Sequence, residues 1–146
     1  MDEAIARAAA APVGRIATVR PDGTPHVVPF VFALTEAEDG IRLYWAVDRK
    51  PKTSTALQRI ENLRANPAVE VVVDEYDDDW SRLWWVRFTG TGRVLSSGPE
   101  RATALEALVA KYPPYRTEPP DGDVIAIDVV SITRWPEHSA GNRGRR

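Results

Sequence analysis

Residues 13–34 read VGRIATVRPDGTPHVVPFVFAL and carry the clearest structural signal in this sequence of 146 residues. The segment Pro21–Thr24 is a strong turn signal, because proline, aspartate and glycine each favour turn conformations for their own steric or hydrogen-bonding reason. A loosely alternating stretch precedes this turn, and Pro25–Leu34 follows it. The pattern predicts a β-hairpin whose second arm places alternate side chains on the core side, namely Val28, Phe30, Phe32 and Leu34.

Strand and helix patterns continue along the rest of the chain. Helical spacing predicts helices over 2–11, 53–66 and 99–112. Alternating or apolar runs predict strands over 41–47, 69–73, 82–95 and 123–135, with a polar connection over 35–40. Because about six strands follow one another with few helical crossovers, we expect a mainly antiparallel β-barrel with flanking helices.

The composition excludes several classes of protein. The chain has no cysteine, so a disulfide scaffold, an iron–sulfur cluster and a cysteine zinc site are excluded. The lack of cysteine is also consistent with a protein of a reducing compartment. A net charge of -2 gives no electrostatic footprint for nucleic acid. No signal peptide or membrane-spanning run is present. We therefore expect one domain over 1–136 and a flexible basic tail over 137–146, in the cytoplasm, with no nucleic-acid or membrane partner.

The stretch 48–54, DRKPKTS, lies where a predicted strand stops and a helix begins. A helix start offers unpaired backbone N–H groups and the positive end of the helix dipole, and both attract anions. Three cationic side chains and two hydroxyls add what a phosphate needs. A simple N-cap with solvated lysines explains the same residues equally well, so this stretch alone leaves both interpretations open.

Two further features bear on ligand binding. Pro29 sits mid-strand, where a missing N–H indicates an edge strand, a bulge or a position open to a ligand. Trp84 and Trp85 must point to opposite faces. Trp84 shares the predicted interior face with Val86, Phe88, Gly90, Gly92 and Val94. Trp85 and Arg87 then lie on the outer face, which suggests a subunit interface or a flat ligand, and Trp80 is a further candidate for ring stacking.

Acid–base and metal motifs are weak. His26 and His138 are far apart in sequence, and His26 is predicted to be a hydrogen-bonded surface or edge residue. The run 77–79 of three aspartates lacks the spacing of a calcium loop and is predicted to be a solvated turn. No metal site is expected, and no catalytic acid or base is assigned.

Several of these motifs resemble those of one family. The hairpin from Ile16 to Pro29 resembles the opening of pyridoxamine-phosphate-oxidase-like split barrels, as does the stretch Lys50–Thr53 leading into a helix that ends at Asn66-Pro67. The run 77–87, DDDWSRLWWVR, resembles the F420-dependent subgroup of actinobacteria. The likeness extends from about Val13 to Trp135.

This resemblance implies an FMN-binding split-barrel fold, Greek-key-like and antiparallel, that forms a homodimer with two cofactors between the subunits. The cofactor phosphate would lie at Lys50, Lys52 and Thr53. The ring would lie along the two strands that hold Val28, Pro29, Phe30, Ala46 and Asp48. The partner chain would close over it with Trp80 and Arg87. The chain departs from many members at Pro29, where they carry a polar residue.

The resulting hypothesis is hydride transfer between reduced F420 and a small reducible organic substrate, with the organic chemistry supplied by the cofactor. Three alternatives remain. The first is an FMN-dependent oxidase or reductase on the same fold. The second is a non-catalytic carrier of flavin, deazaflavin or haem, with His26 or His138 as the available imidazole ligands for iron. The third is a dimeric scaffold with Trp85 at its interface.

Overall fold

A computed structural model describes residues 1–47 and 54–137. The predicted site residues Asp48, Lys50, Lys52 and Thr53 lie outside these described residues. The same holds for positions 138–146 of the predicted tail.

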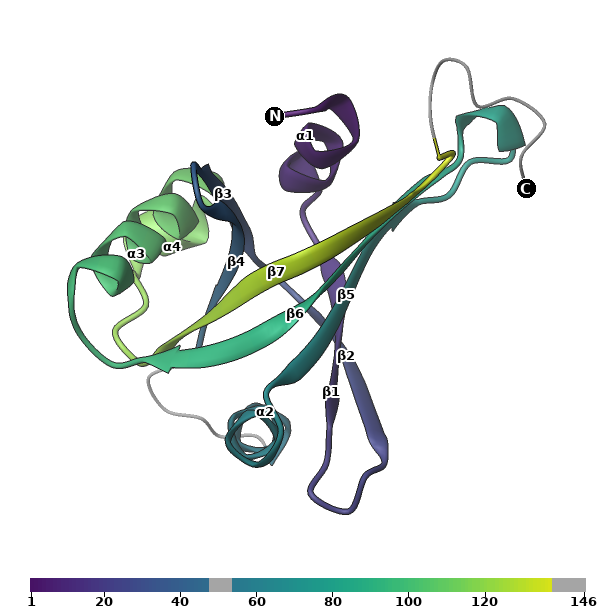
Figure 1. Cartoon of the computed structure of the whole chain (residues 1–146). Coiled ribbons are helices and arrows are strands. Elements are labelled where there is room, and N and C mark those ends of the chain that lie inside the picture. The colour runs from purple at the N-terminus through teal and green to yellow at the C-terminus, as the bar shows by residue number, and fades with distance from the viewer. Residues whose placement is uncertain (48–53, 138–146) are drawn as a thin grey trace.

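The described chain forms one antiparallel sheet with helices around it (Figure 1). The sheet has seven strands in the order β2-β1-β5-β6-β7-β4-β3. In chain order the elements are α1 Glu3–Ala10, β1 Gly14–Val19, β2 Pro25–Phe30, β3 Ala33–Ala37, β4 Gly40–Ala46, α2 Ser54–Ala65, β5 Ala68–Glu75, the 3-10 turn η1 Trp80–Arg82, β6 Trp84–Leu95, α3 Pro99–Lys111, α4 Pro114–Thr117 and β7 Val124–Trp135. The mainly β barrel with flanking helices is confirmed, with one strand more than expected.

The predicted hairpin forms because its turn satisfies its own polar groups. Gly23 takes a φ of 90°, which glycine tolerates without strain. The Thr24 N–H donates to the Asp22 carboxylate at 3.0 Å, and the Arg20 N–H donates to the Thr24 carbonyl at 2.8 Å. Strand β2 pairs only with β1 among the described strands, so the edge strand, one of the three alternatives that Pro29 left open, is found.

The prediction of one strand over Pro25–Leu34 is wrong. Strand β2 ends at Phe30 and β3 begins at Ala33, at the opposite edge of the sheet, and β3 also takes up part of the predicted polar connection 35–40. Residues at the C-terminal end of α3 stabilise this break between the two strands. The Phe32 N–H donates to the Tyr112 hydroxyl at 3.0 Å, and the Lys111 ammonium donates to the Phe32 carbonyl at 2.8 Å.

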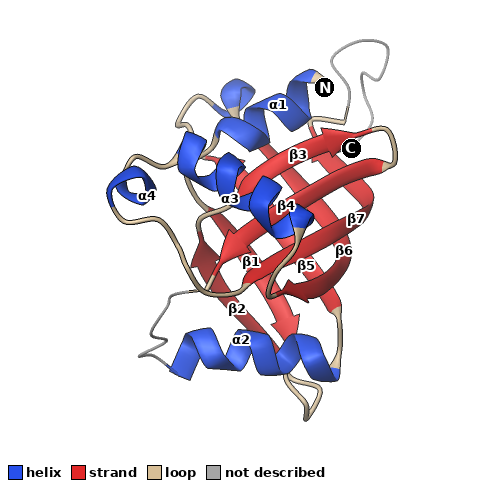
Figure 2. Cartoon of the chain, turned by 90° about the vertical axis from the view of Figure 1, so that its left-hand side faces the viewer, coloured by secondary structure: helices blue, strands red, loops and turns tan. Residues whose placement is uncertain are grey.

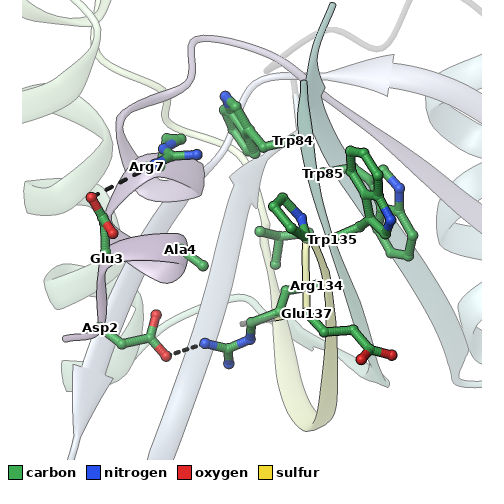
Figure 3. A pocket seen from close by; sticks show the side chains of 11 residues that line it. Asp2, Glu3, Ala4, Arg7, Trp84, Trp85, Arg134, Trp135 and Glu137 are labelled. Carbon is green, nitrogen blue, oxygen red and sulfur yellow. Dashed lines mark hydrogen bonds and ion pairs between the residues drawn. The ribbon is translucent and has the colours of Figure 1, made fainter. Parts of the chain in front are cut away.

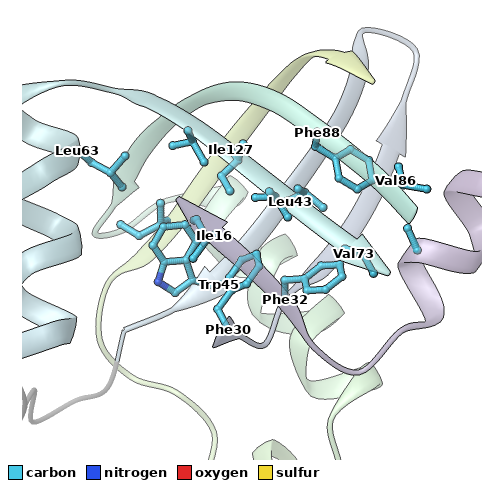
Figure 4. Packing of buried hydrophobic residues seen from close by; sticks show 14 of the residues in the cluster. Ile16, Phe30, Phe32, Leu43, Trp45, Leu63, Val73, Val86, Phe88 and Ile127 are labelled. Atoms are coloured by element: carbon cyan, nitrogen blue, oxygen red, sulfur yellow. The ribbon is translucent and has the colours of Figure 1, made fainter. Parts of the chain in front are cut away.

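The sheet curls because side chains from strands near its two opposite edges are buried in one core (Figure 4). Phe30 on edge strand β2 packs edge-on against Trp45 on β4, with ring centroids 5.7 Å apart. Phe88 and Ile127 from the central strands belong to the same core cluster and are fully buried. The prediction that Trp84 points into the barrel interior is confirmed, since this residue is only 6% exposed.

The helices cover separate parts of the barrel (Figure 2). Helix α3 packs over β3 and β4, α1 contacts β6 at one end, and α2 contacts β1 and β6 at the other. Leu63 of α2 lies so close to Gly92 that a β-carbon at that position would approach it to 2.8 Å. The small residue therefore lets α2 lie tightly against the end of the sheet.

A charge cluster under α3 links three elements. Arg93 of β6 donates to Glu100 of α3 at 2.9 Å and to Asp128 of β7 at 2.6 Å. These hydrogen bonds from Arg93 lower the pKa of both carboxyl groups. Arg42 of β4 adds a bond to Asp128 at 3.0 Å. The cluster fixes the position of α3 on the sheet.

The bulge between β6 and β7 gives a stability prediction. At Gly90 a β-carbon would overlap the backbone carbonyl oxygen of Asp128. We expect Gly90→Ala to lower the free energy of unfolding by about 1–3 kcal/mol, because backbone cannot move aside as a side chain can. Urea denaturation followed by circular dichroism measures this. The matched change Thr91→Ala, at an exposed neighbour, should cost less than about 0.5 kcal/mol. An unchanged midpoint for Gly90→Ala would contradict the close strand approach.

The charge cluster gives a pH prediction. Carboxyl groups with a lowered folded-state pKa contribute stability above their unfolded pKa, and this stability is lost as the pH falls through the folded value. For Glu100 and Asp128 that loss begins below about pH 4. We expect Arg93→Gln to lower the free energy of unfolding by about 1 kcal/mol at pH 7, since each partner is about one-third exposed. Below pH 4 the difference from the wild-type protein should shrink. A constant difference down to pH 2 would rule out this coupling.

Candidate functional site

The outer face of β2, β1, β5 and β6 carries a shallow groove. The register brings Pro29, Arg15, Val72 and Arg87 into one row across these strands. The next row contains Val27, Ala17, Glu70 and Thr89. Most of these residues line a groove of about 520 Å³. We call this surface the outer sheet face. Its lining mixes apolar side chains, such as Val27 and Val72, with charged ones, which suits a partner surface or a flat ligand.

The charged residues of the outer sheet face are loosely paired. Arg87 lies 3.8 Å from Glu70, and its guanidinium lies 5.6 Å from the ring centroid of Trp85. Arg15 lies 3.4 Å from Asp74. All four charged side chains are about half exposed, so these pairs contribute little to stability. Both arginines therefore have N–H donors that a ligand or partner can reach.

A buried polar network joins α2 to β1. It lies at the end of the barrel opposite α1, and we call this end the barrel mouth. The Asn62 side chain is fully buried and donates to the Thr18 hydroxyl at 2.9 Å. The Gln58 amide donates to Asn62 at 2.8 Å. Because buried polar groups are costly when unpaired, this network sets how α2 lies across the mouth.

Two cationic side chains and an imidazole lie at the same mouth. Arg59 of α2 stacks on Trp45 at 5.5 Å from the ring centroid. His26 of β2 has a buried Nδ1 without a hydrogen-bond partner in the part of the chain that the structure describes. Burial lowers the pKa of His26, and the charges of Arg20 and Arg59 lower it further. The expectation of a hydrogen-bonded surface residue therefore does not hold for Nδ1.

The predicted ring contacts do not share one surface of the chain. Val28 and Phe30 point into the core, whereas Pro29 points outward and is exposed. Ala46 packs on the far side of β4, beside residues of α3. Asp48 lies outside the described residues. As contacts for a cofactor ring, these five residues remain predictions.

The two residues expected to close over a partner's cofactor lie on consecutive elements, Trp80 in η1 and Arg87 in β6. Trp80 is 69% exposed at the start of η1, with its indole N–H 3.4 Å from the Tyr76 hydroxyl. Arg87 lies on the outer sheet face beside Trp85, as the alternation predicted. The structure therefore leaves both side chains accessible. Their role toward a cofactor remains a prediction, as does that of Lys50, Lys52 and Thr53 outside the described residues.

A second cavity of about 270 Å³ lies at the other end of the barrel, between α1 and the ends of β6 and β7 (Figure 3). Arg7 stacks on Trp84 at 5.5 Å from the ring centroid, and Arg134 pairs with Asp2. Figure 3 shows Trp85 pointing away from α1. The arginines and acids of this cavity largely neutralise one another, so it has no clear preference for ligand charge.

Sequence reasoning missed the groove residues Arg15 and Val72 and the polar network of Asn62. The alternation along each strand could have placed Arg15 and Val72 on an outer face. No sequence signal shows that β1 lies beside β5, which is the pairing that puts them side by side. Asn62 gave no signal either, because its partner Thr18 is 44 positions away.

No helix within 1–47 and 54–137 is long and apolar enough to cross a bilayer. The same residues contain no cluster of three or more His, Asp or Glu side chains that could hold a metal ion.

Comparisons with known proteins agree with this architecture. No curated protein matches the chain. A FAD-binding protein from Mesorhizobium loti is 25% identical, with a TM-score of 0.65 over 90% of this chain and 91% of that one. A conserved hypothetical protein from Mycobacterium tuberculosis is 22% identical, with a TM-score of 0.67 over 98% and 94%. A heme-binding protein from Mycobacterium smegmatis is 17% identical, with a TM-score of 0.66 over 93% of this chain but 52% of that one.

The model of one protein family, described as pyridoxamine 5'-phosphate oxidase, matches residues 1–136. This range covers the whole barrel, from α1 to the end of β7. The chain therefore belongs to the pyridoxamine 5'-phosphate oxidase family.

Proposed function

We propose that this protein is an oxidoreductase that transfers a hydride between the deazaflavin F420 and a small reducible organic molecule. The observation that carries the proposal is the match of an oxidase family to the entire barrel. When bound, the cofactor supplies the hydride chemistry. The chain supplies the phosphate site, the orientation of the ring and a surface that excludes water.

The barrel mouth fits a cofactor that ends in a phosphate or a carboxylate. Arg20 and Arg59 both lie close enough to His26 to lower its pKa, so positive charge gathers at this mouth. The chain leaves β4 and enters α2 at the same end of the molecule (Figure 1). We propose that Lys50, Lys52 and Thr53, in the segment between them, hold the phosphate.

The choice of F420 over FMN rests on charge. F420 carries an acidic lactyl-glutamyl tail that FMN lacks, and a surplus of cations suits it. Arg49, Lys50 and Lys52 precede α2, and Arg59 lies on that helix. FMN also needs a cation at its phosphate, so an FMN-dependent oxidase or reductase of the same fold is the alternative.

We propose a homodimer that pairs through the outer sheet face. Val27 is 64% exposed at the rim of the groove, and such apolar exposure beside charged residues is typical of interfaces. The two arginines lie in one row and Glu70 lies in the next, so the face can complement a second copy of itself. In this dimer Trp80 and Arg87 would close over the cofactor of the partner.

A non-catalytic carrier is the second candidate. Two structural neighbours are described as FAD-binding and heme-binding proteins, which favours binding as a function in its own right. Turnover distinguishes the two candidates. Oxidation of reduced F420 by a panel of enones and quinones supports the enzyme. Tight binding without turnover across the whole panel supports the carrier.

Cofactor binding tests the proposed site directly. We expect F420 to bind more tightly than FMN, and Lys52→Ala to weaken F420 binding about tenfold or more through loss of a charge-assisted contact. Fluorescence titration measures both dissociation constants, and circular dichroism checks the fold. Arg64→Ala is the matched control, because Arg64 is exposed at the far end of α2. Equal affinity of Lys52→Ala and the wild-type protein would remove this segment from the site.

The oligomeric state tests the proposed interface. Val27→Glu should shift the dimer toward monomer, because it replaces an exposed apolar side chain of the proposed interface with a charged one. Ala102→Glu on the exposed side of α3 is the control and should leave the dimer intact. Sedimentation equilibrium gives the dissociation constants, with at least a tenfold increase expected for Val27→Glu. A monomeric wild-type protein, or a Val27→Glu dimer of unchanged affinity, would refute the interface.

A further inference from the structure

Strand β2 is an edge strand that carries no charged side chain. It pairs with β1 on one side, and no described strand pairs with it on the other. Residues 25–34 contain no Asp, Glu, Lys or Arg, and Val27 is 64% exposed. An exposed, uncharged edge strand of high β propensity is a template on which a second chain can add a strand. The backbone of this strand shows how such pairing is avoided.

The hydrogen bonds of the hairpin identify the groups that lie on the free edge of β2. The Arg20 N–H donates to the Thr24 carbonyl at 2.8 Å, so these two residues form a hydrogen-bonded pair. Hydrogen-bonded and non-hydrogen-bonded pairs alternate along an antiparallel ladder, so His26 and Val28 direct their backbone groups to β1. The backbone groups of the alternate residues point to the free edge: Pro25, Val27 and Pro29.

These edge positions are poor in hydrogen-bond donors. Proline has no backbone N–H, so among Pro25, Val27 and Pro29 only Val27 can donate to an added strand. Arg20 removes an acceptor as well, since its guanidinium donates to the Pro25 carbonyl at 2.7 Å. The edge therefore lacks the regular alternation of donors and acceptors that a pairing strand requires.

The two prolines are placed symmetrically about Val27. If β2 of a second copy paired antiparallel with this strand about Val27, Pro25 of each copy would face Pro29 of the other. Each hydrogen-bonded pair of an antiparallel ladder exchanges two bonds. The proline pairs could form none of them, and only the Val27 pair would keep its bonds. The symmetric pairing of two identical strands is therefore the arrangement that the prolines weaken most.

We propose that Pro25, Pro29 and Arg20 close the free edge of β2 to strand pairing, so that a second copy of the chain packs on the outer sheet face and does not extend the sheet. The closed edge follows from the hairpin alone and involves no cofactor. The packing of the second copy rests on the proposed homodimer. Val27 belongs to both surfaces, since its side chain lines the groove and its N–H lies on the edge.

Restoring the two missing N–H groups tests the closed edge. We expect Pro25→Val/Pro29→Val to form species larger than a dimer, in amounts that increase with concentration, because its edge then has a donor at every position. Sedimentation velocity measures their size, and infrared spectroscopy detects intermolecular β-sheet. Pro119→Val is the matched control, because Pro119 is exposed outside the helices and strands, and it should sediment as the wild-type protein does. A folded double variant that also sediments as the wild-type protein would overturn the proposal.

Amide hydrogen exchange tests the edge in the wild-type protein, so it does not depend on the folding of a variant. We expect the Val27 N–H to exchange about 100-fold faster than the N–H groups of His26 and Val28, which are bonded to β1. This ratio should be the same in dilute and in concentrated protein. Protection of the Val27 N–H that develops as the concentration rises would indicate strand pairing at this edge and would count against the proposal.

The two measurements also separate this inference from the proposed function. A wild-type dimer whose Val27 N–H exchanges rapidly, with larger species only in the double variant, supports both the closed edge and the packed face. A monomeric wild-type protein whose double variant assembles supports the closed edge and refutes the proposed interface. A wild-type dimer with a protected Val27 N–H overturns the inference and leaves the proposed cofactor and hydride transfer intact.

Discussion

The edge-on contact between Phe30 and Trp45 joins two ends of a sheet that no described strand ladder connects. Hydrophobic burial, rather than backbone hydrogen bonding, therefore holds the barrel closed at this seam. Because Phe30 lies on edge strand β2, the contact also decides where that edge lies relative to β4. The outer sheet face and the barrel mouth both take their positions from this arrangement.

Polar side chains are buried at one end of this barrel, the barrel mouth. Asn62 and Thr18 bond to one another there, and the guanidinium of Arg59 rests on Trp45. Their low-dielectric surroundings strengthen electrostatic interactions and make an unpaired atom such as His26 Nδ1 costly. These contacts fix the position of α2 against the mouth. The outer sheet face differs, since its charges are solvated and its apolar residues are exposed.

Much of the local structure follows from the sequence. The turn at Pro21–Thr24, the edge position of Pro29 and the opposite orientations of Trp84 and Trp85 agree with the structure. The single strand over Pro25–Leu34 does not. Its pattern of alternating apolar residues is continuous, but the Phe32 backbone bonds to Tyr112, which is 80 positions away. A contact at that separation leaves no trace in the local pattern.

The sequence by itself determined the type of most elements and which side chains of each strand face inward. This is possible because alternation and helical spacing are properties of local backbone geometry. Only the tertiary structure decided which strands are neighbours, and so which side chains meet. The row from Pro29 to Arg87 and the contact of Arg59 with Trp45 depend on the lateral order of strands and the placement of α2. That order results from burying apolar side chains from distant segments together, and no single stretch of the chain encodes it.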